Sequence, residues 1–231
     1  MFLCAGLLCV WHKSAAGQDA TPAPSAPAPQ TAAEDNAAND RRMFKIVPNF
    51  KTVDDSQQPI VALSPGQKFD LAERYFDPTT FLFTGITAGF EQAANEKAGY
   101  GQGALGYGKR YGADFADGLT NAILATAVFP TLLHQDPRFH RLGQGSGWRR
   151  TGYALTRVLI TNGDSGTVQF NASEILGTMT SGALSMTYYP PSDRSAGLVF
   201  TRMSFQIGYD SLFNVLAEFY PDLKRKFSRH H

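Results

Sequence analysis

The sequence has almost no cysteine. Its 231 residues contain two, Cys4 and Cys9, and both lie within the first ten positions. The rest of the chain has no thiol, so it cannot form a disulfide, supply a thiolate nucleophile or bind a metal through cysteine. The chain also lacks a Walker loop and the His-Glu-x-x-His pair of zinc peptidases. We therefore expect no metal and no cofactor, and these motifs assign no enzyme class.

Charged residues are scarce as well. They make up 18% of the chain, with a formal net charge of +1, whereas about 25% is typical of soluble domains. Binding to nucleic acid requires a clear surplus of basic side chains, so this balance argues against nucleic acid as a partner. Glycines and aromatic residues are plentiful, with 22 glycines and 12% aromatics. Low charge with this composition indicates extensive burial or contact with lipid.

Long hydrophobic runs are missing too. Residues 118–133 carry no charge, but sixteen helical residues rise only about 24 Å against a hydrocarbon thickness near 30 Å. Residues 175–192 are also uncharged, yet they contain several Ser and Thr residues and two prolines. The polarity of these segments favours a soluble bundle, and a domain at or partly within a membrane is the alternative.

The N-terminal part has the composition of an export signal followed by a tether. Met1–Val10 is an apolar run about as long as the hydrophobic region of a signal peptide, and we expect that peptide to cover residues 1–17. Residues 18–42 are rich in Ala and Pro and predict a disordered linker. Residues 43–231 would then form one domain, exported to the periplasm or outer envelope and associated with a membrane there.

The pattern of the domain predicts an all-α fold. Ser64 before Pro65 and Asp77 before Pro78 are helix-start signals, and Asn171 begins a capping box. We expect a compact bundle of five or six helices, over residues 65–76, 78–97, 104–129, 148–160, 172–188 and 193–220, with Pro130 and Pro221 ending or kinking two of them. An outer-membrane barrel is the second choice, because no series of alternating ten-residue segments is present.

Two strips of small residues suggest how the helices pack. Residues four apart lie on one helical face, and small side chains there let two backbones approach closely. We expect the two strips to face each other and to form the centre of the fold. The first consists of Ala104, Gly108, Gly112, Ala116 and Thr120, and the second of Ser173, Gly177, Ser181 and Ser185.

The segment 134–141 holds the densest set of chemically capable side chains. Three of them, as metal ligands or an acid and base pair, are weak catalytic candidates: His134, Asp136 and His140. Two more could hold a phosphate or carboxylate: Arg138 and Arg141. The spacing matches no standard site, and a solvated loop whose turn is capped by Asp136 explains the same residues without a function.

Further charges lie in helices that otherwise look buried, and buried charges are expected to pair. We predict that an arginine meets an acid within the set Arg150, Arg157, Arg202, Asp114, Asp117, Glu174 and Asp210. Such a network would either fix the register of the helices or form a polar pocket for an anionic headgroup. The near balance of acids and bases favours the structural interpretation.

These features lead to a functional hypothesis. We expect an exported cell-envelope protein with a binding or structural role, whose partner is an envelope membrane or another protein. The competing hypothesis is a hydrolase that acts on lipid or phosphoester substrates through the 134–141 loop.

Overall fold

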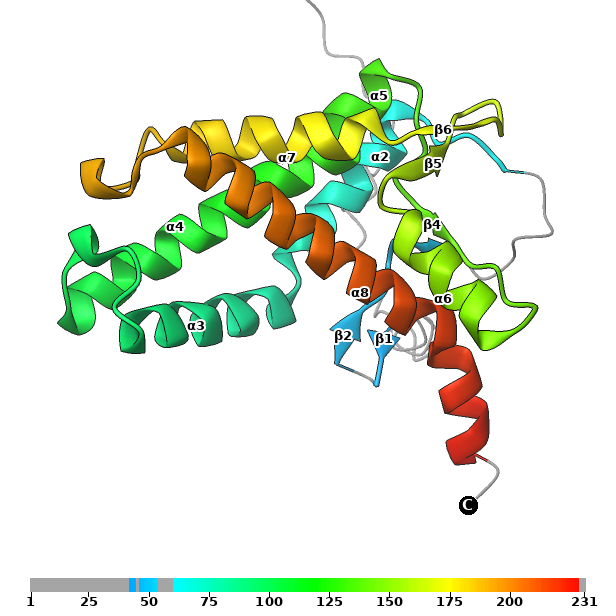
Figure 1. Cartoon of the computed structure of the whole chain (residues 1–231), viewed down its shortest axis with the longest axis horizontal. Helices are drawn as coiled ribbons and strands as arrows, with labels where there is room; N and C mark the ends of the chain where they lie inside the picture. Colours follow the sequence, from blue (N-terminus) through cyan, green and yellow to red (C-terminus); the bar gives the residue numbers. More distant parts are fainter. Residues whose placement is uncertain (1–41, 45, 54–59, 229–231) are drawn as a thin grey trace, which may run out of the picture.

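The computed structural model describes residues 42–44, 46–53 and 60–228 (Figure 1). The expected signal peptide, 1–17, and the expected linker up to residue 41 lie outside the described residues. Arg42, which we placed at the end of the linker, belongs to a strand of the domain instead, and its guanidinium donates to the Asp77 carboxylate at 3.1 Å. The folded domain therefore begins no later than Arg42.

Helix dominates the described residues, as the sequence predicts. Six of its helices have nine residues or more, and the strands are only two or three residues long. In chain order the elements are β1 (Arg42–Met43), β2 (Val47–Pro48), β3 (Thr52–Val53), α2 (Pro65–Glu73), η1 (Arg74–Phe76), α3 (Pro78–Ala93), η2 (Ala98–Tyr100), α4 (Gly103–Ile123), η3 (Leu124–Val128), α5 (Phe129–Leu132), β4 (Phe139–His140), α6 (Gly147–Thr156), β5 (Ile160–Asn162), β6 (Val168–Phe170), α7 (Ala172–Ser185), η4 (Pro191–Asp193) and α8 (Ala196–Ser228).

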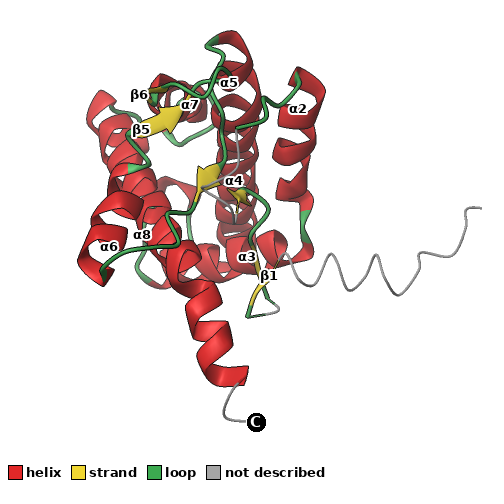
Figure 2. Cartoon of the chain, turned by 90° about the vertical axis from the view of Figure 1, so that its right-hand side faces the viewer, coloured by secondary structure: helices red, strands yellow, loops and turns green. Residues whose placement is uncertain are grey.

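The helices form one packed body with α8 crossing it diagonally (Figure 1). Helix α3 packs against α4, α7 lies across α4 and η3, and α8 contacts both α6 and α7. The strands form three small pairs, β1 with β2, β3 with β4 and β5 with β6, of which only β3–β4 is parallel. Figure 2 shows the short strands on the side of the domain that this view turns to the reader.

The helix-start signals at Ser64 and Asp77 are confirmed, whereas the helix expected from residue 193 begins at Ala196. Ser64 Oγ accepts from the backbone N–H of Gln67 at 3.3 Å, and the Ser64 N–H donates to the Gln67 side chain at 2.9 Å, which completes a capping box. The Asp77 carboxylate caps α3 by accepting from the Thr79 N–H at 2.9 Å. Each cap satisfies a backbone donor that the first helical turn leaves free.

The expected effect of the two prolines is only partly right. Pro130 lies inside a continuous helical rod, because the π turn η3 just before it widens the helix and accommodates a ring without an N–H. Pro221 does not end α8, which continues to Ser228. Beside it, the Glu218 carbonyl accepts from the guanidinium groups of Arg141 and Arg150 at 2.8 and 2.7 Å, so residues distant in the sequence hold this part of α8 in place.

Other boundaries also differ from expectation. The helix expected over 148–160 ends at Thr156, because Ile160–Asn162 pairs with Val168–Phe170 in a hairpin whose turn covers residues 163–167. Helix α3 ends at Ala93 rather than near Lys97, where a left-handed backbone, φ 51°, interrupts helix geometry. The hairpin was missed because each of its strands has only three residues, too few for a period to show.

The two small-residue strips differ in how deeply they are buried. The second is buried as predicted: Ser173, Ser181 and Ser185 are 2%, 5% and 0% exposed. A Cβ added at Gly177 would lie 2.6 Å from the Ala125 Cα, so α7 and η3 do approach backbone to backbone.

The first strip does not face the second, and this part of the prediction is wrong. Gly108 and Gly112 of α4 are exposed, and a Cβ on either would meet nothing within 4 Å. The buried face of α4 carries Gly106, Arg110 and Ala113 instead. Helix α4 turns this face inward because Arg110 finds hydrogen-bond acceptors there.

One glycine from each strip gives a matched test. We expect Gly177→Ala to lower the free energy of unfolding by about 1–3 kcal/mol, because the added methyl group overlaps backbone atoms of η3. Gly108→Ala should leave it unchanged or raise it by up to about 1 kcal/mol, since alanine is the better helix former. Denaturant unfolding followed by far-ultraviolet circular dichroism measures both, and equal effects would contradict the close approach.

Candidate functional site

The 134–141 segment forms a tied structural turn around Asp136. The Asp136 side chain is fully buried, and its two oxygens accept from Arg138 Nε at 2.9 Å and Arg138 Nη2 at 2.7 Å. His140 Nε2 lies 3.1 Å from the same carboxylate. The Asp136 backbone bonds Asn162 and Thr161 in β5. The expected turn at Asp136 is thus present, but it is anchored to a hairpin and is not solvated.

The remaining candidates of this segment do not converge on that carboxylate. His134 is exposed, with 85% of its side chain accessible, and its Nδ1 lies 3.9 Å from Asp164. Arg141 points to the other side and donates to the Glu218 carbonyl. Within residues 42–44, 46–53 and 60–228, no three His, Cys, Asp or Glu side chains come together as metal ligands.

The pKa of the Asp136 carboxyl is lowered, as expected for a carboxylate held in an ion pair. Burial alone would raise the pKa of the Asp136 carboxyl, but the hydrogen bonds from His140 and Arg138 outweigh burial and lower the pKa to about 2. A carboxyl whose folded pKa lies below its unfolded value stabilises the fold above the unfolded pKa. This stabilisation is lost as the pH falls from about 4 toward 2.

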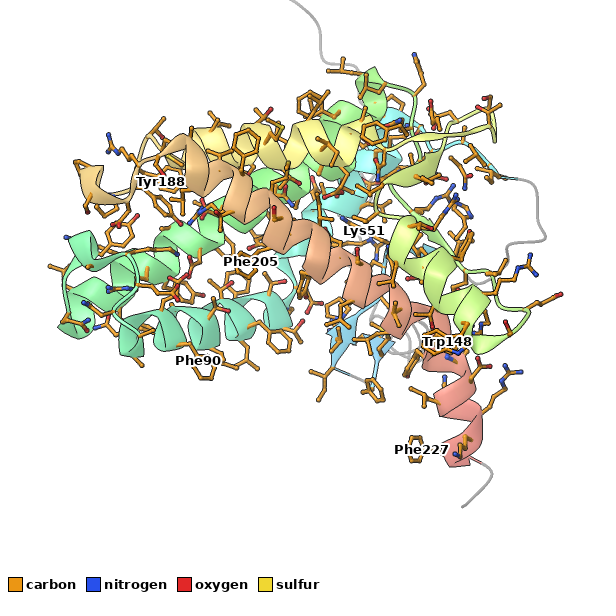
Figure 3. The ribbon with its side chains drawn as sticks, in the orientation of Figure 1. Lys51, Phe90, Trp148, Tyr188, Phe205 and Phe227 are labelled. Carbon is orange, nitrogen blue, oxygen red and sulfur yellow. The ribbon has the colours of Figure 1, made fainter. Side chains whose placement is uncertain are left out.

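The most extensive polar cluster lies at the opposite end of the domain, where α4 meets the chain between α7 and α8. The Arg202 guanidinium donates to Asp117 Oδ2 at 2.6 Å and lies over the Tyr189 ring, 4.2 Å from its centroid. The Tyr189 hydroxyl donates to the same carboxylate at 2.6 Å, and the Tyr188 hydroxyl donates to its other oxygen. Figure 3 shows Tyr188 at this end of the molecule. We call this group, with the residues of the next paragraph, the Asp117 cluster.

A second ion pair continues the cluster. Lys97 Nζ donates to Glu91 at 2.6 Å and also to Asp114, and its ammonium lies 5.4 Å from the Tyr189 ring centroid. Asp114 Oδ2 and Arg202 Nε are buried without a hydrogen-bond partner among the described residues. One free acceptor and one free donor in a packed polar cluster suit a water molecule or a small polar group.

Within the set in which we expect an arginine to meet an acid, Arg202 lies 2.6 Å from Asp117. Arg150 is paired too, but with acids absent from our set: Glu218 at 2.8 Å and Asp222 at 2.6 Å. Arg157 stacks over the Tyr153 ring at 5.1 Å. The last two acids of the set, Glu174 and Asp210, accept from Thr178 and Gln206. Burial, and next the nearby Asp210 carboxylate, raise the pKa of the Glu174 carboxyl to about 7.

Several buried polar residues lie outside the predicted pairing set. Lys68, 1% exposed, donates to Asp164 at 2.9 Å and to the Pro130 carbonyl. Arg110, fully buried, donates to the carbonyls of Glu96, Lys97 and Gly101. Arg110 therefore holds the turn between α3 and α4 through neutral acceptors. A search for unlike charges in the sequence cannot find such a residue, because its partners are backbone atoms.

We expect Asp136→Asn to lower the free energy of unfolding by about 2 kcal/mol at neutral pH, because the substitution removes a carboxylate with a depressed pKa. The variant should also lose less stability than the parent between pH 4 and pH 2. Denaturant unfolding across this range measures the difference. Asp70→Asn on the exposed face of α2 is the control, and parallel pH profiles for parent and Asp136→Asn would contradict the assignment.

Removal of one partner from the Asp117 cluster should be costly. We expect Arg202→Met to destabilise the fold by about 3 kcal/mol, because Asp117, with 20% of its side chain exposed, loses its cation. Arg225→Met is the matched control, since Arg225 also pairs with an acid but has 70% of its side chain exposed, and should cost at most about 0.5 kcal/mol. Thermal and denaturant unfolding compare them; similar losses would show that the buried pair adds no stability.

Neither side-chain cluster has the arrangement of a nucleophile, a base and an orienting group. The Asp136 carboxylate is fully engaged, and the Asp117 cluster is held by cations and tyrosines that bond one another. Comparisons of the chain with protein-family models, curated proteins and solved structures found no significant match.

Proposed function

We propose that this protein is a cell-envelope component that associates with a membrane through its exposed apolar helices and has a binding or structural role. The observation that supports this most is the distribution of polarity. In the described part of the chain, most fully buried hydrophobic residues are alanines, and no leucine or isoleucine is fully buried. Buried positions are occupied by charged and hydroxyl side chains, including Lys68, Arg110 and Glu218.

The outer surface has the opposite composition. Large apolar side chains are exposed on every helix of nine residues or more, whereas a soluble domain keeps many of them inside. On α3 alone the exposed set is Phe81, Leu82, Phe83, Ile86 and Phe90. Figure 3 shows Phe90 pointing away from the bundle. In lipid, exposure of these apolar side chains would cost no free energy.

Helix α8 presents the longest apolar stripe. Its exposed residues recur at intervals of three, four or seven and therefore lie on one helical face: Phe205, Tyr209, Leu212, Leu216, Leu223 and Phe227. Two charged residues of α8 bond other helices instead: Arg202 bonds Asp117 of α4, and Glu218 bonds Arg150 of α6. Because the 23 helical residues 205–227 extend about 34 Å, this stripe is about as long as the hydrocarbon thickness of a bilayer, about 30 Å.

One described helical rod, Gly103–Leu132, is long and apolar enough to cross a bilayer by length and composition. Only 22% of its apolar window is buried inside the domain. The core helix of a soluble protein passes the same test but would be mostly buried. Three of the four charged residues of the rod bond groups inside the domain: Arg110 bonds backbone carbonyls, and Asp114 and Asp117 bond the cations of the Asp117 cluster. The fourth, Lys109, is exposed.

The competing hydrolase hypothesis receives less support, because Asp136 is engaged by Arg138 and His140, and His134 lies outside this cluster.

A protein surface is the other occupant that the apolar helices could contact. A second copy of this chain or an envelope protein would cover the same side chains.

Fractionation of the native protein separates these possibilities. We expect the full chain to stay with the membrane fraction through washes with high salt and alkaline carbonate, and to dissolve only in detergent, because apolar contact does not depend on salt. Release by salt, or a soluble monomer without detergent, would contradict membrane residence. A soluble oligomer of defined mass would assign the apolar helices to protein contacts instead.

A further inference from the structure

The corner where α6 begins and α8 ends differs from the rest of the apolar surface. The last turns of α8 project beyond the body of the domain (Figures 1 and 2). The start of α6 lies beside them, since Arg150 of α6 bonds Asp222 of α8 at 2.6 Å and lies 4.4 Å from the Phe219 ring centroid. We call residues 143–150 and 218–228 together the basic corner.

The basic corner combines exposed aromatic rings with a surplus of positive charge. Trp148 is 89% exposed and Phe227 is 65% exposed, and both are labelled on this corner in Figure 3. Basic residues outnumber acidic ones by five to two: Arg149, Arg150, Lys224, Arg225 and Lys226 against Glu218 and Asp222. The two acids are already bonded by Arg150 and Arg225. Arg149 and Lys226 add further positive charge, and both are exposed.

The corner is also held in a fixed shape. Glu218, fully buried, accepts the backbone N–H groups of Leu142 and Gly143 at 2.9 and 2.8 Å, so the loop before α6 is fastened to α8. Ser146 caps α6, and the helix N-terminus adds positive potential beside Trp148 and Arg149. A ligand that binds the rings and cations would therefore have to order little of the backbone that carries them.

We propose that the basic corner binds the anionic headgroups of a lipid bilayer. This inference rests on the proposed membrane residence. It adds the class of lipid that is bound and the part of the domain that binds it. An aromatic ring with a polar edge and long basic side chains are the combination that favours the headgroup region. The apolar stripe of α8 leads into the corner through Leu223 and Phe227, so one helix would contact acyl chains along its length and headgroups at its end.

An acidic protein surface would satisfy the charge but not the rest. It would have to cover Trp148 and Phe227 and also meet the apolar stripe that continues along α8. A bilayer offers both environments in the order in which α8 presents them.

The test uses the full chain and two kinds of vesicle, phosphatidylcholine alone and phosphatidylcholine mixed with phosphatidylglycerol. We expect at least about tenfold stronger partitioning into the mixed vesicles at low salt, since each basic side chain near an anionic surface contributes about 1 kcal/mol. Lys226→Glu should remove most of this difference. Lys109→Glu, an equal charge change at an exposed position of α4, should retain it.

A spectroscopic readout locates the contact. With Trp11→Phe in place, Trp148 is the chain's single tryptophan, and its emission should shift to shorter wavelength on mixed vesicles and be quenched by brominated lipid. Equal partitioning into both vesicles would overturn the headgroup inference and leave membrane residence standing. Failure to bind either vesicle would contradict both. An equal loss in Lys226→Glu and Lys109→Glu, or an unchanged Trp148 spectrum, would also overturn the role of the basic corner.

Discussion

The fold depends on the pairing of charges inside it. A buried charge without a partner costs several kcal/mol, so every cation that the helices enclose must find an acid, a carbonyl or a ring. Arg202 finds Asp117, Arg150 finds Glu218, and Arg110 finds three carbonyls of the turn before its own helix. Because the bonds of Arg202 and Arg150 connect residues 85 and 68 positions apart in the sequence, they fix how the helices cross.

This polar interior explains the unusual exterior. Small residues such as Gly177 and Ser185 let α7 and its neighbours approach closely, which leaves little internal volume for leucine or phenylalanine side chains. The large apolar side chains are displaced outward. In water such a surface would favour association, whereas in a membrane it would be solvated. The interior and the exterior are therefore two consequences of the same packing.

The candidate site shows which side-chain contacts can be predicted from residue patterns and which cannot. The pairing of Arg202 with Asp117 followed from the rule that charges in apolar helices need partners. The sequence offered no way to rank Asp136 as a structural carboxylate, because the groups that bond its backbone come from β5, a three-residue strand without a detectable pattern. Glu218 and Asp222 were missed because we ended α8 at Pro221, which made them look like the frayed end of a helix.

The sequence by itself determined the helical class and most helix starts, because caps such as Ser64 and Asp77 are satisfied within four residues of chain. It also indicated that one small-residue strip, on α7, would be buried. Only the tertiary structure decided which face of α4 turns inward, because that choice follows from acceptors around Arg110. Likewise, only the tertiary structure showed that α8 continues past Pro221, where Asp222 bonds Arg150 of α6. Local hydrogen bonds are encoded in neighbouring residues, whereas the partner of a buried charge is defined only once the helices have met.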